Sequence, residues 1–308
     1  MRNCNKKYYQ TLFLIVFALL TAYSLQLSAT IRYVSKTGNS TPPYTSWATA
    51  ADSIQKCINV CVFGDTIYVA NGVYEEQVVM ISGLSLIGAG MDSCVIYLSA
   101  TGIPAVQIAD TCFLEGFKIL LPNTMNTWGI EVIGFDSFIT LNNVVNASLG
   151  LYLSDVYAEV YKNTFQNIKT RGIWILNSNS IIRQNHIYID PNSQASSPTG
   201  IRIEAFSDTY TSLIDSNYLV NVYYTGIDKF LGTTPTIKNN VIIMKYGTGI
   251  DIDDGGTTTI ANNIILNSGY IGINGFSPSY ILLYNNYIMG KPGSDGIKVW
   301  SNSVVRIM

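Results

Sequence analysis

Charged side chains are scarce in this chain, and neither sign dominates. They make up 12% of the 308 residues, with 18 Lys and Arg against 20 Asp and Glu. A chain without a basic excess has no electrostatic attraction for a polyanion, so we expect no nucleic-acid partner. Histidine is almost absent: the single His186 follows Asn185, where we expect a surface or packing role rather than catalysis. An apolar content of 48% excludes a disordered chain.

The apolar run near the N-terminus, Leu12–Leu20, is too short to span a bilayer. It follows the basic Arg2, Lys6 and Lys7 and precedes Leu27-Ser28-Ala29, the pattern of a secretory signal peptide. We therefore predict that residues 1–29 are cleaved and that the protein is secreted or lies at the cell surface, without a membrane span. An uncleaved anchor is the alternative. Cleavage removes 3 of 18 basic residues, leaving 15 against 20 acidic residues, a net charge near −5.

Cysteine is sparse as well. Cys4 would leave with the signal peptide, and the other four, Cys57, Cys61, Cys94 and Cys112, all lie in the N-terminal part of the chain. Export permits disulfide bonds between them. Small buried thiols are the equal alternative.

A repeated phrase fills the chain from Gly129 onward. A Gly, a branched apolar residue, a variable residue and another apolar residue recur about every 22 to 24 residues, and an Asn follows each Gly after about 14 residues. A fixed period of this size predicts a solenoid, in which each repeat buries its apolar face against the next. The phrases begin at Gly129, Gly150, Gly172, Gly200, Gly226, Gly249, Gly272 and Gly296, and the asparagines are Asn143, Asn163, Asn185, Asn217, Asn240, Asn263 and Asn286.

The repeated asparagines have a structural explanation. Asn tolerates the left-handed backbone of a tight corner better than other non-Gly residues. Asn amides stacked one strand spacing apart also bond to each other, so we predict an Asn ladder along the solenoid rather than a binding motif. One repeat carries an insertion, Ile189–Pro198, and such insertions often wall a groove.

The two ends of the solenoid differ. Residues 46–60 show helical spacing, and we predict an amphipathic helix that caps the N-terminal end of the stack. No closing helix or polar cap follows the last Gly phrase before Met308. Either this end stacks on a partner or, as we favour, the chain is the N-terminal piece of a longer protein with downstream domains.

Three N-terminal segments, Tyr33–Asn39, Ser46–Ala50 and Gly64–Glu76, together with the repeat, resemble exported proteins of the pectate-lyase-like superfamily. The run from Gly72 to Gly90 is also similar to the start of pectin methylesterases. The resemblance covers residues 31–308. It implies an all-β fold, a right-handed parallel β-helix of about ten coils over residues 30–308. Enzymes and proteins without known chemistry share this module, so no activity follows from it.

The catalytic motifs of two related enzyme families are missing. The sequences that flank the Gln, two Asp and Arg of pectin methylesterases do not occur here. Of the polygalacturonase motifs, the Asp pair is present as Asp253-Asp254, the Gly-His-Gly is absent, and Gly296-Ile297-Lys298 matches the last motif only faintly.

The variable residues of the Gly phrases should form one outward row if the coils are in register. This row reads Glu131, Tyr152, Trp174, Arg202, Asp228, Asp251, Asn274 and Lys298, and two residues further along each strand come Ile133, Ser154, Leu176, Glu204, Phe230, Asp253, Phe276 and Trp300. The resemblance implies that this face binds polysaccharide. The predicted substrate-binding residues are Tyr152, Trp174, Arg202, Glu204, Phe230, Phe276 and Trp300. The alternative is that the aromatic residues pair across strands and stabilise the sheet.

An acidic cluster, Asp228, Asp251, Asp253 and Asp254, lies on the same predicted face. Carboxylates this close raise one pKa or recruit a cation. Asp251, Asp253 and Asp254 could bind Ca²⁺, the one cofactor that the residues suggest. Asp228, Asp251 and Asp253 could instead serve glycoside hydrolysis, or a lyase centre with Lys298 or Arg202 as base and Ca²⁺ on a uronate. A solvated polar face is the remaining interpretation.

Three functions are compatible with these features. The sequence favours a secreted or cell-surface protein that binds a polysaccharide or cell-surface glycan without catalysis. A polysaccharide lyase or glycoside hydrolase acting on uronate-containing polymers is the alternative, and a purely structural rod is the third.

Overall fold

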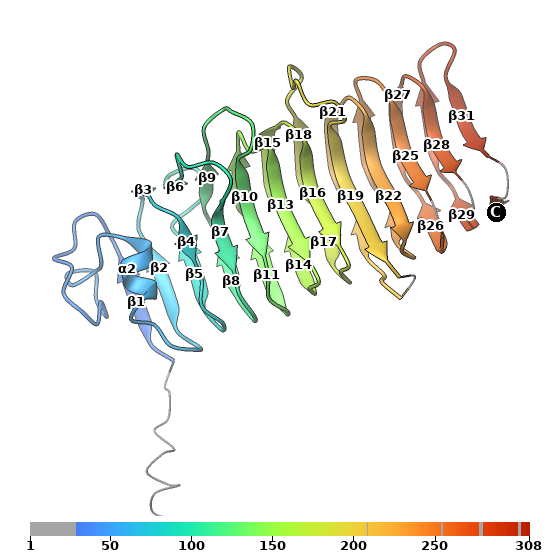
Figure 1. Cartoon of the computed structure of the whole chain (residues 1–308). Helices are drawn as coiled ribbons and strands as arrows, with labels where there is room; N and C mark the ends of the chain where they lie inside the picture. The colour runs from blue at the N-terminus through green and yellow to red at the C-terminus, as the bar shows by residue number, and fades with distance from the viewer. Residues whose placement is uncertain (1–28, 208, 254, 277–279, 301–302) are drawn as a thin grey trace, which may run out of the picture.

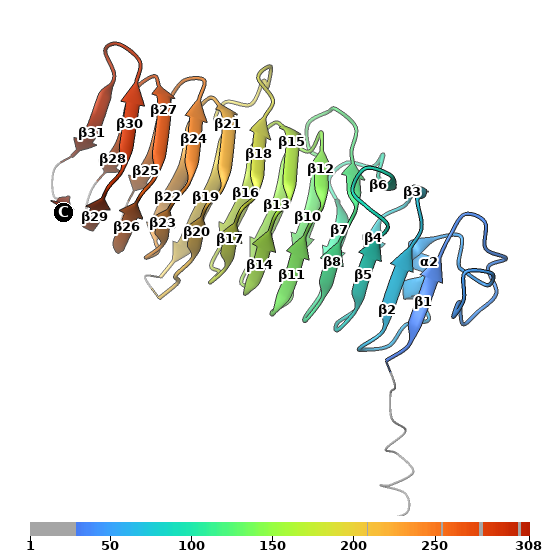
Figure 2. The same cartoon turned by 180° about the vertical axis from the view of Figure 1, so that it is seen from behind.

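The chain forms a right-handed solenoid of three parallel β-sheets in a computed structural model (Figure 1). The structure describes residues 29–207, 209–253, 255–276, 280–300 and 303–308. From β2 onward each coil gives one strand to each sheet, so neighbours within a sheet lie three strands apart in the chain, and β1 pairs directly with β2 at the N-terminal end (Figure 2). The fold class and the coil number of about ten are as predicted. Most of the predicted signal peptide lies outside the described residues.

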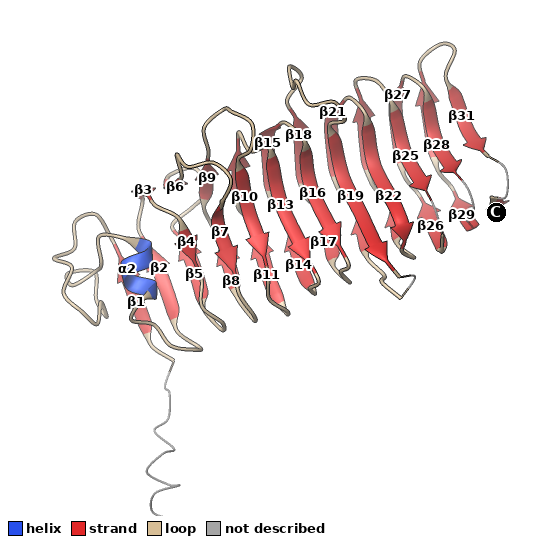
Figure 3. Ribbon diagram, in the orientation of Figure 1, coloured by secondary structure: helices blue, strands red, loops and turns tan. Residues whose placement is uncertain are grey.

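The strands of the described residues fall into sheets A, B and C (Figure 3). Sheet A contains β1 (Ile31–Val34), β2 (Thr66–Val69), β5 (Ser85–Gly88), β8 (Phe113–Glu115), β11 (Ser137–Thr140), β14 (Ala158–Tyr161), β17 (Ile181–Arg183), β20 (Leu213–Asp215), β23 (Thr236–Lys238), β26 (Thr257–Ala261), β29 (Tyr280–Tyr284) and β32 (Val304–Ile307). Sheet B contains β3 (Gly72–Glu75), β6 (Cys94–Tyr97), β9 (Lys118–Leu120), β12 (Asn143–Val145), β15 (Thr164–Ile168), β18 (His186–Ile189), β21 (Tyr218–Val222), β24 (Val241–Met244), β27 (Ile264–Ser268) and β30 (Tyr287–Gly290). Sheet C contains β4 (Val78–Val79), β7 (Pro104–Ile108), β10 (Trp128–Val132), β13 (Leu149–Ser154), β16 (Arg171–Leu176), β19 (Thr199–Phe206), β22 (Thr225–Gly232), β25 (Thr248–Asp253), β28 (Ile271–Phe276) and β31 (Asp295–Val299).

The glycines of the repeat stand where successive coils approach most closely, at the start of the sheet C strands. A Cβ atom on Gly150 would lie 2.5 Å from the carbonyl oxygen of Gly172 and 2.7 Å from Cδ1 of Phe165. No side chain fits there, so only Gly allows the coils to stack. The apolar residues that follow, such as Leu151 and Leu153, are fully buried and belong to one core that runs through the solenoid.

A row of asparagine side chains connects the coils at the corner between sheets A and B. Each Oδ1 accepts hydrogen bonds of 2.9–3.2 Å from the backbone N–H and the Nδ2 of the Asn one coil earlier. The asparagine row consists of Asn142, Asn163, Asn185, Asn217, Asn240, Asn263 and Asn286.

The structure corrects two details of the sequence interpretation at this corner. The row begins at Asn142, whereas Asn143 is the first residue of β12 and points its amide toward Gln166 at 3.5 Å. The left-handed backbone belongs to the residue before each member, such as Leu141 with φ 53° and Lys162 with φ 54°. The Asn itself is therefore selected by its amide hydrogen bonds and not by its tolerance of positive φ.

Helix α2 (Ile54–Ile58) is much shorter than the predicted 46–60. The residues before the helix pair with β1 instead: the backbone of Ala51 hydrogen-bonds to that of Tyr33 and Ser35. The N-cap is Ser53, and the Glu76 carboxylate accepts from the first two helical N–H groups at 2.8 Å each. The helix packs its buried face against β1, β2 and β4 at the N-terminal end of the stack. No helix within the described ranges is long and apolar enough to cross a membrane.

The four described cysteines are free thiols. Of the two alternatives left by the sequence, the structure therefore has thiols rather than disulfides. Cys57, Cys94 and Cys112 are buried, and Cys61 donates to the carbonyl oxygen of Cys57 at 3.3 Å.

The asparagine row predicts that alanine substitutions at two adjacent residues, Asn142 and Asn143, differ sharply in their effect on the free energy of unfolding. Asn142→Ala removes the acceptor of the Phe117 N–H and three buried donor contacts, so it should lower the free energy of unfolding by about 3 kcal/mol. Asn143→Ala should change it by less than about 0.5 kcal/mol. Thermal and urea unfolding followed by circular dichroism measures both, and equal losses would contradict the assignment of the row.

Candidate functional site

The outward face of sheet C carries the predicted row in register. Coil-to-coil pairing connects Glu131, Tyr152, Trp174, Arg202, Asp228, Asp251, Asn274 and Lys298 in that order. The second predicted row is divided. Ser154, Leu176, Glu204 and Phe230 pair in sequence, and so do Asp253 and Phe276, but the pairing of β22 with β25 ends at Lys229 with Ile252.

The predicted aromatic residues form separate clusters rather than one continuous stripe. The Tyr152 ring lies 6.4 Å from Trp128 and 4.9 Å from Trp174, whose ring is also covered by the Arg171 guanidinium at 4.6 Å. A second cluster joins Phe276 and Trp300 at 5.7 Å. Phe230 lies between them beneath the Arg202 guanidinium at 4.5 Å. These contacts stabilise the sheet as cross-strand pairs do.

Arg202 is the centre of a charged cluster between the aromatic groups. Its Nε donates to Oε2 of Glu204 at 3.0 Å, and its Nη1 donates to Oδ2 of Asp228 at 2.6 Å. Asp228 is only 8% exposed. Burial raises the pKa of the Asp228 carboxyl, and the Arg202 charge opposes that rise. Arg202 therefore opposes the protonation that burial favours and fixes one oxygen of the Asp228 carboxyl.

Asp251 follows one coil later in a different environment. Its Oδ1 accepts from Nδ2 of Asn274 at 2.8 Å, and Oδ1 of Asn274 accepts from Nε1 of Trp300 at 2.9 Å. The indole is only a donor, so it orients the Asn274 amide with its NH₂ toward Asp251. Burial raises the pKa of Asp251 to about 6, the Asn274 hydrogen bond opposes the rise, and the carboxylates of Asp228 and Asp253 add to it.

A cavity of about 340 Å³ opens beside Asp251 at the edge where sheet B leads into sheet C. Three exposed tyrosine rings line it in a row, with centroids 5.8 Å apart for Tyr223 and Tyr246 and 4.7 Å apart for Tyr246 and Tyr270. Sequence reasoning missed these tyrosines because it followed the Gly phrases alone. Their signal is a Tyr two or three residues before Gly226, Gly249 and Gly272.

The structure does not assemble the other predicted sites. Asp254 of the predicted Ca²⁺ set lies outside the described residues, and within the described part no group of three His, Cys, Asp or Glu side chains is placed to hold a metal ion. The fully buried Lys229 donates its ammonium to the carbonyl oxygens of Asp253 and Gly255, so a cation already supports this turn. Lys298, the predicted lyase base, lies two coils beyond Asp251 and pairs with Asp295 at 3.4 Å.

Comparison with known proteins places the chain by its fold. A family profile described as the right handed beta helix region matches residues 128–288 and 232–308. No curated protein matches the sequence.

The solved structures that share the fold include the following three. A GH136 lacto-N-biosidase from Eubacterium ramulus has a TM-score of 0.62 at 11% identity, covering 100% of this chain and 72% of that one. ORF18 of Geobacillus virus E2 has a TM-score of 0.58 at 15% identity over 82% of this chain, which spans 56% of that protein's length. The pectin methylesterase from carrot has a TM-score of 0.53 at 10% identity, covering 92% and 90%. Identities this low describe a common fold.

The raised pKa of Asp251 makes stability depend on pH. The folded state holds the Asp251 proton up to about pH 6, whereas the unfolded chain releases it near pH 3.8, so its contribution to stability is lost as pH rises through 6. Asp251→Asn keeps an acceptor for Asn274 without the charge. The variant should match wild type at pH 4 and be more stable by about 2 kcal/mol at pH 7.5. Melting temperatures across this range measure the difference.

The exposed Asp155→Asn variant controls for the loss of one negative charge. If Asp251→Asn melts at the wild-type temperature at both pH values, Asp251 is not a carboxyl whose proton is retained by burial.

Proposed function

This chain belongs to the right-handed β-helix family, and we propose that it is a secreted glycoside hydrolase that cleaves a neutral glycan on sheet C, with Asp251 as the proton donor. Export through the N-terminal signal peptide is part of this proposal. The sequence alone favoured glycan binding without catalysis. The local geometry around Asp251 favours hydrolysis over binding alone.

One observation carries the proposal: Asp251 opens onto a tyrosine-lined cavity, and Asp228 on the preceding coil is paired with Arg202. Asp251 has a pKa of about 6 and keeps its proton in mildly acidic solution. Burial raises the pKa of Asp228 as well, but the Arg202 charge opposes that rise, so we assign Asp228 as the ionised partner of the pair. Glycoside hydrolysis requires this division, because one carboxylic acid protonates the leaving oxygen while a second, ionised carboxylate acts at the sugar ring.

The reaction can be written with these two groups. Asp251 transfers its proton to the glycosidic oxygen as the bond from that oxygen to the anomeric carbon breaks. Oδ2 of Asp228 is occupied by Arg202, which leaves Oδ1 to attack the anomeric carbon. Water then replaces Asp228 and returns a proton to Asp251. Paired residues on neighbouring strands lie about 4.8 Å apart at Cα, so the two side chains stand next to each other on the sheet. The two-step route requires their carboxyl groups to be roughly 5–5.5 Å apart.

The charges around the pair favour a neutral substrate over a uronate polymer. Arg202 is paired with both Glu204 and Asp228, and Lys298 is paired with Asp295. A uronate carboxylate would meet the acidic pair without a cation already directed at it. The rings of Tyr223, Tyr246 and Tyr270 instead offer flat apolar faces with hydroxyls at their edges, a surface suited to uncharged sugar rings. The likeness to the lacto-N-biosidase supports only the compatibility of this fold with glycoside hydrolysis.

Glycan binding without catalysis is the second candidate, and the cluster of Trp128, Tyr152 and Trp174 favours it. This cluster lies on the outward face of sheet C, away from the acidic pair by at least one coil. A protein that only binds glycans needs such a platform and has no use for a retained proton at Asp251.

Asp251→Asn separates the two candidates. With β-glucan, α-glucan, xylan, galactan and mannan as substrates, wild type should release reducing ends from at least one polymer. The variant should lose at least about 100-fold in kcat with little change in KM, because it lacks the proton and keeps the shape. Asp155→Asn should retain wild-type activity. An inactive wild type on every polymer, or an active Asp251→Asn, would refute hydrolysis.

The pH profile tests the role of Asp251 as the acid. Since the protonated form is the active one, kcat should fall as pH rises through about 6. The Asn274 hydrogen bond favours the ionised form, so Asn274→Ala should move this fall to higher pH. Initial rates between pH 4 and 9 measure the shift. A shift to lower pH would contradict the assignment.

A further inference from the structure

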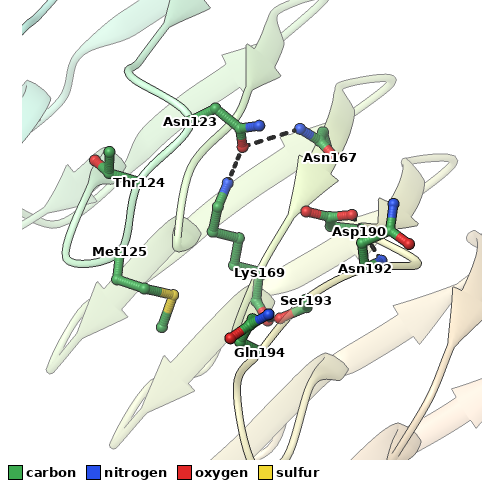
Figure 4. A pocket seen from close by; sticks show the side chains of 9 residues that line it. All are labelled: Asn123, Thr124, Met125, Asn167, Lys169, Asp190, Asn192, Ser193 and Gln194. Atoms are coloured by element: carbon green, nitrogen blue, oxygen red, sulfur yellow. Dashed lines mark hydrogen bonds between the residues drawn. The ribbon is translucent and has the colours of Figure 1, made fainter.

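A second cavity, of about 410 Å³, lies further toward the N-terminus on the edge between sheets B and C. Residues from three coils line it: those after β9, those at and just beyond the end of β15, and those after β18, with the coil of β12 between the first two (Figure 4). The last group belongs to the Ile189–Pro198 insertion. The lining residues are Asn123, Thr124, Met125, Asn167, Lys169, Asp190, Asn192, Ser193 and Gln194.

Lys169 is the most unusual group in this cavity, because it is only 7% exposed. Its ammonium donates to Oδ1 of Asn123, which also accepts from Nδ2 of Asn167 at 3.3 Å. An ammonium has three N–H donors, so two of them meet no hydrogen-bond acceptor among the residues that the structure describes. Burial lowers the pKa of Lys169, and the nearby Asp190 charge opposes this. Unsatisfied donors on a buried cation are costly, and a ligand oxygen would satisfy them.

The rest of the wall supplies both donors and acceptors. Oδ1 of Asp190 accepts from the Asn192 N–H at 2.9 Å, which leaves its second oxygen available. The side chains of Asn123 and Gln194 present amide groups at the rim. Lys169 and Asp190 balance in charge, so the cavity attracts neither anions nor cations strongly. Sugar hydroxyls, each a donor and an acceptor, match such a mixed and neutral wall.

The polar cavity and the tyrosine-lined cavity are connected by a row of shared lining residues. A third cavity of about 310 Å³ shares Asp190, Ser193 and Gln194 with the first and Tyr223 with the cavity beside Asp251. Nζ of Lys245 donates to the carbonyl oxygen of Pro191 at 2.8 Å and fastens the insertion over this path. The path extends from the coil of β16 to the coil of β25, three coil steps or about 14 Å.

We propose that the cavity around Lys169 binds the hydroxyls of a sugar unit in the same glycan chain that reaches Asp251, so that the substrate is an extended neutral oligo- or polysaccharide lying along the solenoid axis. The insertion forms the wall of this groove. The inference rests on the proposed function only for the place where the chain is cleaved.

Binding is tested apart from cleavage in the Asp251→Asn background, with affinity electrophoresis in gels containing the five polymers named above. Lys169→Met keeps the apolar stem and removes the ammonium, and the exposed Gln194→Ala changes the rim without touching buried groups. Both should weaken retention by at least one polymer, Lys169→Met by about tenfold. Lys162→Met, whose ammonium lies over Tyr161 on sheet A, is the matched control and should bind as the parent does.

Melting temperatures verify that each variant is folded, and Gln194→Ala keeps the test decisive if Lys169→Met is unstable. Polymer binding that is unchanged by both variants, or a parent that binds none of the polymers, overturns the inference. If Lys169→Met weakens binding but wild type cleaves nothing, the groove stands and the hydrolase proposal fails. If wild type cleaves polymers with a KM that neither variant changes, the hydrolase stands and the groove fails.

Discussion

The close stacking of successive coils is the constraint on which the rest of this structure depends. From β10 onward, Gly near the start of each sheet C strand removes the side chain that would keep neighbouring backbones apart. The asparagine row then bonds each coil to the next at the opposite corner through both backbone and side chain. Together the two devices allow only one register, because a slip by one residue would turn the apolar side chains outward.

A single register converts a linear repeat into a surface whose chemistry changes from coil to coil. The same outward position holds Tyr152, Trp174, Arg202, Asp228 and Asp251 on five successive coils. Because neighbours are about 4.8 Å apart, each side chain acts on the next. The Arg202 charge opposes the rise that burial causes in the pKa of Asp228, and the charge of Asp228 in turn raises the pKa of Asp251. The candidate site thus consists of side chains at one strand position whose charge and burial change from coil to coil, and not of residues from distant loops.

This explains which parts were predictable from sequence. The outward row of sheet C could be predicted because alternation within a strand and the coil period leave one arrangement. Features that depend on competition between neighbouring residues for the same partners could not be predicted from the sequence. Helix α2 is short because β1 recruits Ala51, and the row starts at Asn142 because its amide, not the Asn143 amide, faces the next coil. Lys229 lies at an apolar position of the phrase, and its buried ammonium donates to the carbonyl oxygens of Asp253 and Gly255, which the repeat pattern does not reveal.

The tyrosines and the insertion show a different limit. They lie in the turns before sheet C: the tyrosines precede Gly226, Gly249 and Gly272 by two or three residues, outside the repeated phrase, and the insertion occurs in one coil. The structure places them on the same edge as Asp251, and three adjoining cavities follow. The coils and the turns therefore have separate roles: the sheet holds two carboxyl groups in unequal environments, and the turns shape the cavities beside them. If the proposed function holds, a new substrate would require changes only in the turns, because the register that sets the pKa of Asp251 is maintained by glycines and asparagines packed between the coils.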